Sequence, residues 1–246
     1  MVQVYSAYTP EDFKVWELLF TRQIANLQSV ASKDYLKGIE EVKFTKDKIP
    51  NFDETNALLK QLTGWSLEVV PGLIPQVDFF QLLSQKKFSA TTWLRKLSQL
   101  DYLEEPDMFH DVFGHVPLLS NHAYCKFFEG LSNIALKHID NPKVIEALGR
   151  IYWFTIEFGL IREDGELKIY GAGILSSPGE TKHSLSESPE VLAFDIPTLF
   201  ESDYRTDVFQ TKYFVIDSYE QLYNSLEKIE EELEQLIEKF QATQTI

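Results

Sequence analysis

Residues 105–119 read EPDMFHDVFGHVPLL and place two histidines, His110 and His115, in one strongly apolar segment. The apolar and aromatic residues on either side of the histidines predict that the segment enters the core. A buried imidazole needs a hydrogen-bond partner or a metal ion. Asp107 and Asp111 are close enough in sequence to supply carboxylates that orient the two rings toward a metal.

The spacing of the two histidines restricts the backbone between them. Five steps along an ideal α-helix separate two side chains by about 140°, so they do not share a face. Both rings can bind one metal only if the helix widens into a π-type turn or ends between them. Gly114 weakens the helix before His115, and Pro117 disfavours its continuation. Taken alone, the pair fits two hydrogen-bonded core histidines equally well.

A second apolar segment, residues 149–161 (GRIYWFTIEFGLI), contains a single acidic residue, Glu157. Apolar residues on nearly all sides are typical of a buried helix. A buried carboxylate without a partner would cost several kcal/mol or become protonated. Arg150 and Arg162 flank the segment, where long side chains reach water. A divalent metal shared with the histidines is one partner, and a protonated or arginine-paired core glutamate is the alternative.

Two histidines and one carboxylate are the ligand set of non-haem Fe(II) oxygenases, which leaves coordination positions open. Zinc on the same three ligands would make a hydrolase instead. The spacing of the ligands does not distinguish the two metals.

Three motifs in this order resemble the pterin-dependent aromatic amino acid hydroxylases: residues 105–119, IYWFTIEFGL at 151–160 and YGAGILSS at 170–177. Bacterial phenylalanine 4-monooxygenases are the most similar branch, and the resemblance extends from about Trp16 to Tyr219. It implies ring hydroxylation of a free amino acid with O2, Fe(II) and tetrahydrobiopterin or a related tetrahydropterin. L-Phenylalanine is the implied substrate and L-tyrosine the product, with tyrosine or tryptophan hydroxylation as the alternative within the family.

The resemblance also implies roles for individual residues. It assigns the iron, and with it catalysis, to His110, His115 and Glu157. Pterin-binding residues are implied at Gly72, Ile74, Phe79, Asp111 and Tyr152. Substrate-binding residues are implied at Arg95, Leu103, Pro106, Asp107, Trp153, Gly173, Ser176 and Ser177. Animal phenylalanine hydroxylases have Thr where this chain has Leu103, so a transfer of roles from that branch is weakest there.

Two of these assignments have a direct chemical basis. A guanidinium such as that of Arg95 presents two parallel donors to a carboxylate and stays charged, and Asp107 is a suitable partner to hold it in place. A flat pterin ring stacks on an aromatic face such as that of Phe79. Without the resemblance, Arg95 would be interpreted as a solvated surface residue and Phe79 as an ordinary core residue.

Composition restricts the class of protein. The 246 residues are 44% apolar and 25% charged, as in soluble globular proteins, and allow one domain, 1–246, with a large core. A net charge of -15 disfavours nucleic acid as a partner. No stretch approaches the ~20 apolar residues of a membrane span, and the N-terminus lacks a signal-peptide pattern. The single cysteine, Cys125, fits a buried structural thiol in a reducing, cytoplasmic compartment.

The pattern of elements predicts an α+β fold that is predominantly α-helical, with a small β-hairpin beside the buried metal site. Thr9-Pro10 begins a helix whose inward side is expected to include Phe13, Trp16 and Phe20. Residues 65–80 are expected to form a loop with short extended pieces, and residues 80–88 a short helix. Asp164-Gly165 predicts a hairpin turn, and residues 212–217 a final strand. His122, His138 and His183 are expected at the surface.

The C-terminal residues 218–241 show apolar residues at alternating spacings of four and three: Leu222, Leu226, Ile229, Leu233, Leu236 and Phe240. This heptad pattern predicts a helix that packs on its own domain or forms a short coiled coil between chains. Three heptads are marginal alone, so packing within a monomer is favoured over a dimer. A coiled-coil adaptor without enzymatic activity is the remaining alternative class.

Overall fold

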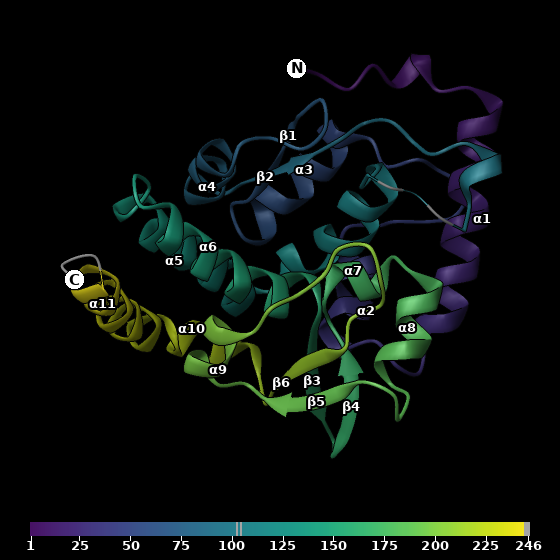
Figure 1. Cartoon of the computed structure of the whole chain (residues 1–246). Helices are drawn as coiled ribbons and strands as arrows, with labels where there is room; N and C mark the ends of the chain where they lie inside the picture. The colour runs from purple at the N-terminus through teal and green to yellow at the C-terminus, as the bar shows by residue number, and fades with distance from the viewer. Residues whose placement is uncertain (102, 104, 244–246) are drawn as a thin grey trace.

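The computed structural model describes residues 1–101, 103 and 105–243, although the side chains of 240–243 lie outside the description. It is mostly helical, with a four-stranded sheet at one side of the molecule (Figure 1), and this confirms the predicted α+β class. The α-helices are α1 (Pro10–Leu27), α2 (Lys33–Glu41), α3 (Phe52–Leu62), α4 (Gln76–Ser84), α5 (His122–Lys137), α6 (Pro142–Tyr152), α7 (Ala172–Leu175), α8 (Pro178–Ser184), α9 (Ile196–Glu201), α10 (Tyr219–Asn224) and α11 (Leu226–Thr243).

The strands and the shorter helices complete the described part of the chain. The strands are β1 (Ser66–Val69), β2 (Lys87–Ala90), β3 (Gly159–Glu163), β4 (Glu166–Ile169), β5 (Glu190–Ala193) and β6 (Lys212–Ile216). Short 3₁₀ turns are at Tyr5–Ala7, Leu97–Gln99 and Val116–Ser120, and π-helices are at Phe109–His115 and Trp153–Glu157. None of the described helices combines the length and apolarity that crossing a bilayer requires.

Helix α1 begins as its sequence predicts. Thr9 and Asp12 form a reciprocal capping box, and Pro10 occupies the first helical position. Trp16 and Phe20 are buried, but the prediction for Phe13 was wrong, because this side chain is 37% exposed. Phe13 lies in the first turn, where it packs edge-on against the rings of Tyr5 and Tyr8 instead of the core.

The segment from residue 65 to 90 differs most from its prediction. Helix α4 begins at Gln76 and ends at Ser84, so it starts four residues before the predicted helix and includes Phe79. Pro75 fits this early start. A helix does not use the amide hydrogen of its N-cap residue, so a proline at this position costs no hydrogen bond. After α4 the chain turns at Lys86, whose φ is 59°, into β2, which pairs in parallel with β1. This pairing was not predicted.

The main sheet has the order β4-β3-β6-β5. The predicted hairpin is confirmed, because Asp164 and Gly165 have φ of 52° and 83° between the antiparallel strands β3 and β4. The predicted final strand is β6, which runs parallel to both β3 and β5. Because β3 begins two residues after Glu157, the sheet fixes the end of the segment that carries this carboxylate.

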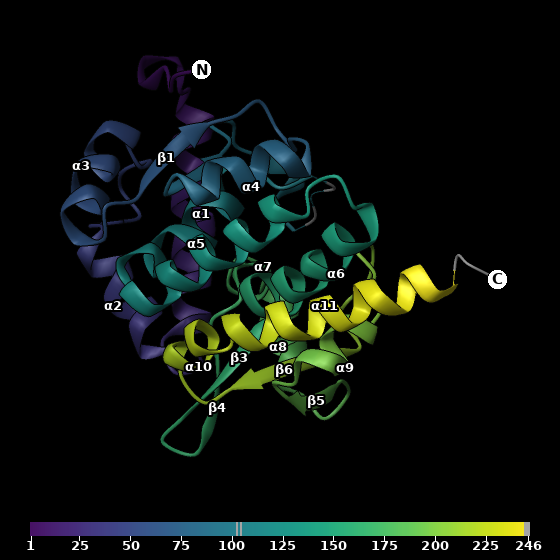
Figure 2. The same ribbon diagram turned by 90° about the vertical axis from the view of Figure 1, so that its left-hand side faces the viewer.

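The C-terminal pattern forms two helices, α10 and α11, that separate at Ser225. Helix α11 packs along α5 and α9 on the outside of the molecule (Figure 2). Leu222, Ile229 and Leu233 are fully buried, as the heptad pattern predicts, whereas the side chain of Phe240 lies outside the description. Cys125 on α5 is also buried, and burial raises the pKa of its thiol to about 12.

Candidate metal centre

The two histidines of the motif lie on a π-helix, Phe109–His115. In a π-helix, backbone hydrogen bonds join residues five apart, so His110 and His115 are one turn apart along the same side. Their ring centroids lie 5.1 Å apart, with the planes nearly perpendicular at 83°. The sequence predicted that the helix must widen or end between these residues, and the widened form is confirmed.

Close packing holds this π-helix in place. A Cβ atom on Gly114 would lie 2.9 Å from the carbonyl oxygen of Ala172, so only glycine allows α7 to approach this closely. The hydroxyl of Tyr35 donates to the carbonyl of Phe113 at 2.8 Å. The rings of Phe109 and Phe113 stack at 4.6 Å. The histidines therefore project from a rigid, fully packed support.

Glu157 is the last residue of the second π-helix, Trp153–Glu157, which continues directly from α6. Its Oε1 atom lies 3.2 Å from Nε2 of His115, and its Oε2 atom lies 3.6 Å from Nε2 of His110. One ligand atom from each residue lies within 4.8 Å of the others. Two segments that are more than forty residues apart in sequence thus bring three metal-ligating side chains together.

The electrostatics of Glu157 favour its charged form. Burial alone would raise the pKa of this carboxyl group, but the electrostatic influence and hydrogen bond of His115, the electrostatic influence of His110 and a hydrogen bond with Tyr152 outweigh burial and lower its pKa to about 2. Within the described part of the chain, no lysine or arginine forms an ion pair with this carboxylate. The described structure therefore does not show the arginine-paired alternative, and the carboxylate faces the two imidazoles, where a divalent metal could bind.

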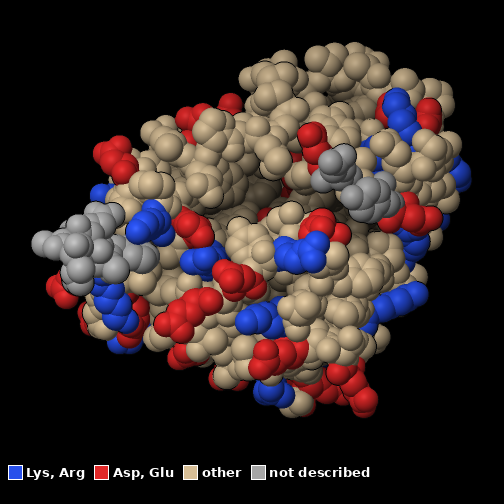
Figure 3. All heavy atoms as spheres, in the orientation of Figure 1, with Lys and Arg blue, Asp and Glu red and all other residues tan. Residues whose placement is uncertain are grey.

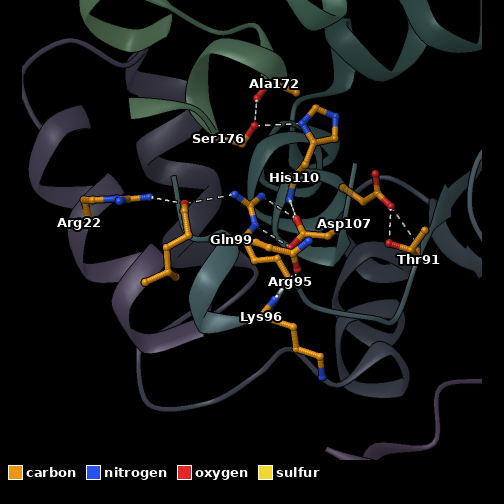
Figure 4. Close-up of polar contacts among 11 residues, drawn as sticks. Arg22, Thr91, Arg95, Lys96, Gln99, Asp107, His110, Ala172 and Ser176 are labelled. Carbon is orange, nitrogen blue, oxygen red and sulfur yellow. Dashed lines mark hydrogen bonds and ion pairs between the residues drawn. The ribbon is translucent and has the colours of Figure 1, made fainter. Parts of the chain in front are cut away.

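The partners of the imidazole rings differ from those predicted. Among the described residues, neither Asp107 nor Asp111 hydrogen-bonds a ring; Asp107 accepts from the backbone N–H of His110 at 3.2 Å, and Asp111 accepts from Thr91. The ring of His110 is instead oriented by Ser176, whose Oγ lies 2.9 Å from Nδ1 (Figure 4). The Nδ1 atom of His115 is buried without a partner in the described part of the chain.

The donor set fits a first-row divalent metal. Two neutral imidazole nitrogens and one carboxylate oxygen suit iron or zinc, and three protein ligands leave coordination positions open. Glu157 and His110 have side chains 14% and 20% exposed, so small molecules can approach from one side. The face shown in Figure 3 is hollowed near its centre, with mostly uncharged walls.

Arg95 is the nearest arginine to the motif in sequence, and Asp107 holds it as predicted. The Oδ2 atom of Asp107 accepts from the backbone N–H and Nε of Arg95, and Oδ1 accepts from Nη2, each at 2.9 Å (Figure 4). Asp107 is fully buried and Arg95 is 10% exposed on its side chain. Because Asp107 also accepts from the His110 backbone, the guanidinium is tied to the same support as the metal ligands.

Two of the residues that the resemblance assigns to the pterin, Phe79 and Tyr152, are connected to Glu157 by contacts between side chains. Phe79 packs edge-on against Tyr152 at 5.3 Å between centroids, and the Tyr152 hydroxyl reaches Glu157. Gly72 and Ile74 lie in the segment that leads into α4, and both are half-buried. The unpredicted start of α4 therefore places Phe79 on a helix, in contact with Tyr152.

The remaining assigned residues are distributed around this centre. Trp153 lies in the turn before Glu157, with its ring between those of Phe158 at 4.6 Å and Tyr204 at 4.3 Å. A Cβ atom on Gly173 would meet the Phe158 ring at 2.7 Å. Ser177 caps helix α8 by accepting from the Glu180 N–H. Leu103 and Pro106 are half-buried in the segment between Arg95 and Asp107.

Several residues that support the site could not be found from the sequence. Thr91, which holds Asp111, follows the unpredicted strand β2. Gln210 accepts a hydrogen bond from Nε1 of Trp153 at 3.0 Å, although it is 57 residues away in sequence. The expectation that His183 is exposed was also wrong, because it lies half-buried in α8, where its Nε2 contacts the carbonyl of Gln210 and its ring stacks on Phe209.

Two imidazoles and one carboxylate on two π-helices form a candidate mononuclear metal site, with the ligand set found in non-haem oxygenases. The family model for the biopterin-dependent aromatic amino acid hydroxylases matches residues 3–245, and the chain belongs to this family. Family membership decides between the classes that the sequence left open. The protein is a pterin-dependent aromatic amino acid monooxygenase, not a zinc hydrolase or a coiled-coil adaptor.

Curated relatives and solved structures agree with this assignment. The chain is 42% identical to phenylalanine-4-hydroxylase of Ralstonia nicotianae over 226 residues, which cover 92% of this chain and 72% of that protein. It is 37% identical to tyrosine 3-monooxygenase of Rattus norvegicus, over 86% of this chain and 43% of that one. The structure of Chromobacterium violaceum phenylalanine hydroxylase with iron(III) and 7,8-dihydrobiopterin matches with a TM-score of 0.91 and 40% identity, covering 97% of this chain and 86% of that one.

Proposed function

We propose that this protein hydroxylates the ring of L-phenylalanine to give L-tyrosine, with O2, Fe(II) and a tetrahydropterin. The observation that carries the proposal is the convergence of His110, His115 and Glu157, with Arg95 tied through Asp107 to the backbone of His110 and Phe79 in contact with Tyr152. The bacterial relatives named phenylalanine-4-hydroxylase, at about 42% identity, support phenylalanine over tyrosine or tryptophan.

In this proposal His110, His115 and Glu157 hold the Fe(II). When bound, the Fe(II) and the tetrahydropterin together supply the reduction of O2 that delivers one oxygen atom to the arene. The protein's own contribution is placement and exclusion of water. Phe88, whose ring lies 4.7 Å from that of His115, covers the imidazole on its core side.

Arg95 receives the carboxylate of the amino acid. The Nη1 and Nη2 atoms carry four N–H bonds, and the hydrogen bonds to Asp107 and to the carbonyl of Leu100 use two of them. The other two remain for a bidentate contact. Trp153, Leu103, Pro106 and Gly173 form the walls around the aromatic ring, and Ser176 and Ser177 complete the polar side of the pocket.

The pterin lies against Phe79 and Tyr152. A flat heteroaromatic ring stacks on the face of Phe79, while the backbone of Gly72 and Ile74 and the carboxylate of Asp111 satisfy its polar edge. The half-buried positions of Phe79 and Tyr152 leave their ring surfaces partly available. The edge-on contact between the two rings holds both in fixed orientation beside Glu157.

We further propose that the chain functions as a monomeric domain, 1–246, in the cytoplasm. Helix α11 covers its apolar stripe with α5 and α9 of the same chain, and Glu230 pairs with Lys137 of α5. The single buried thiol of Cys125 suits a reducing compartment.

Product analysis tests the substrate and the metal together. The purified protein, stripped of metal, is supplied with Fe(II) or Zn(II), a tetrahydropterin, and L-phenylalanine, L-tyrosine or L-tryptophan in turn. The expected result is tyrosine from phenylalanine with Fe(II) only. A hydroxylated product mainly from tyrosine or tryptophan would contradict the proposed substrate, and activity with Zn(II) would contradict the proposed metal.

A further inference from the structure

Helix α1 contacts the segment that connects the two halves of the Arg95–Asp107 pair. The described ends of this segment, which covers residues 95–107, are joined: the backbone N–H of Met108 donates to the carbonyl of Trp93 at 2.9 Å, and Asp107 accepts from the backbone N–H of Arg95. The 3₁₀ turn Leu97–Gln99 lies in its first half. Both Arg95 and the half-buried Leu103 and Pro106 depend on the conformation of this loop.

Two arginines converge on one carbonyl in the loop. The Nη2 atom of Arg22, on α1, donates to the carbonyl of Leu100 at 2.9 Å, and Nη1 of Arg95 approaches the same oxygen at 3.5 Å (Figure 4). Arg22 also pairs through Nη1 with Asp101 at 2.5 Å. Its Nε atom is buried and has no hydrogen-bond partner in the described part of the chain.

A second tether from the same helix holds the other end of the 3₁₀ turn. The carboxylate of Glu11, in the first turn of α1, accepts from the backbone N–H of Leu97 at 3.1 Å. Helix α1 is itself fixed, because Trp16 and Phe20 are buried and Gln23 donates to Thr181 of α8 at 2.9 Å. The loop is therefore held at both sides of its turn by one rigid helix.

We infer that Arg22 is a positioning residue for recognition of the substrate carboxylate, acting through the Leu100 carbonyl on Arg95. This inference rests on the proposed function. Without the Nη2 contact of Arg22, the Leu100 carbonyl is free to turn away from Arg95. The Arg95 guanidinium then loses one of the contacts that orient it, and its two free N–H bonds point over a wider range of directions. A bidentate contact depends on that direction, so the carboxylate loses affinity while the ring pocket does not.

The test compares Arg22→Met with wild type in the Fe(II)-loaded enzyme with a tetrahydropterin. The expected result is a KM for L-phenylalanine raised about tenfold, the size of one lost charge-assisted hydrogen bond, with kcat changed less. Two inhibitors distinguish a loss of carboxylate recognition from a general loosening of the pocket. The Ki of 3-phenylpropanoate, which retains the carboxylate, is expected to rise about as much as KM. The Ki of 2-phenylethylamine, which lacks the carboxylate, is expected to stay within twofold.

Three further variants make the result specific. Arg22→Lys restores a cationic donor and is expected to recover most of the KM. Asp101→Asn removes the ion pair, retains the Leu100 contact and is expected to leave KM within twofold. Lys14→Met removes a cation from the exposed side of the same helix, where it pairs only with Glu17 in the described structure, and serves as the matched control. If Arg22→Met does not fold, Arg22→Gln, whose side chain is too short for the Leu100 carbonyl, is expected to give the same shift.

Equal rises in Ki for both inhibitors would mean general loosening of the pocket and would overturn the inference. So would an unchanged KM in Arg22→Met. These outcomes leave the proposed function intact, because they are judged against an active wild type. A wild type that hydroxylates none of the three amino acids would instead refute the proposed function, and this inference with it.

Discussion

The Nδ1 atom of His110 lies 2.9 Å from Oγ of Ser176, and the same hydroxyl donates to the carbonyl of Ala172 at 2.8 Å (Figure 4). A serine hydroxyl has one proton. Because this proton is directed to Ala172, Oγ accepts from His110, and Nδ1 of the imidazole is the protonated nitrogen. The lone pair of Nε2 then faces Glu157, as metal ligation requires.

Ser176→Ala is therefore expected to weaken Fe(II) binding about 10- to 100-fold, the usual effect of removing a group that orients a ligating histidine. Competition between the protein and a chelator measures the affinity. Ser132→Ala is the matched control, because Ser132 is also buried and also donates to the carbonyl four residues earlier, but on α5 and without a histidine. Equal metal affinity in both variants would contradict the orienting role of Ser176.

Asp107 joins Arg95 to the backbone of His110 from a fully buried position. Asp107→Ala leaves a guanidinium that is almost completely buried without its counter-ion, so we expect a loss of about 3–5 kcal/mol in the free energy of unfolding. Urea denaturation measures this change. Asp203→Ala is the comparison, because Asp203 pairs with Arg150 while 93% exposed, and surface pairs contribute about 0–1 kcal/mol. A similar small effect of both substitutions would show that Arg95 finds another partner.

Glu180 gives stability a pH dependence that is separate from the metal ligands. Burial raises the pKa of this carboxyl group, although the Tyr213 hydroxyl and the Gln210 N–H both donate to it. Because the folded pKa is higher than the unfolded one, the folded protein binds the proton more tightly. The stabilising contribution of protonated Glu180 is complete below the pKa of this group in the unfolded chain, and it is lost as pH rises through its pKa in the folded protein.

Glu180→Gln is expected to remove this part of the pH dependence. We therefore expect the difference between the urea midpoints of wild type and variant, measured at intervals from about pH 4 to 8, to change with pH. The wild type should lose stability relative to the variant as pH rises. Glu187→Gln, at an exposed position, should follow the wild type throughout. Parallel curves for wild type and Glu180→Gln would refute the assignment.

The metal ligands could be predicted because their signal is local. His110 and His115 lie within one short apolar motif, and Glu157 is the only acidic residue of a strongly apolar segment. The steric and electrostatic arguments for these segments use only residues within each segment and do not depend on contacts with distant parts of the chain. The spacing reduced the backbone of a shared site to two forms, a widened helix or a helix that ends between the histidines, and the structure shows the widened form.

The supporting contacts could not be predicted because they are long-range. The sequence left two partners open for the carboxylate of Asp107, an imidazole and Arg95, and only the folded structure shows that the bidentate contact with Arg95 is the one formed. The parallel pairing of β1 with β2 has no signature in either short strand. Residues 65–80 were expected to form a loop, but α4 begins directly after Pro75, so Phe79 lies on a helix and not in the loop.

Gln210 connects the wall of the proposed substrate pocket to the loop before β6. Its Oε1 accepts from the indole of Trp153, its Nε2 donates to the carbonyl of Arg205 at 2.7 Å, and the side chain is buried. The indole of Trp153 also makes ring contacts with Phe158 and Tyr204. Ring contacts alone allow an indole to slide within its plane, so the hydrogen bond with Gln210 fixes its position along the pocket.

Gln210→Ala is therefore expected to loosen Trp153 and to lower the ratio of kcat/KM for L-phenylalanine over L-tryptophan about 3- to 10-fold, because a wall that moves discriminates ring size less well. Trp153→Phe removes the same N–H while retaining an aromatic wall, so it provides the background for a double-mutant cycle. In that background Gln210→Ala has no bond left to break, and the ratio should not change further. If Gln210→Ala lowers the ratio equally in both backgrounds, the residue acts through the loop at 203–211 and not through the indole.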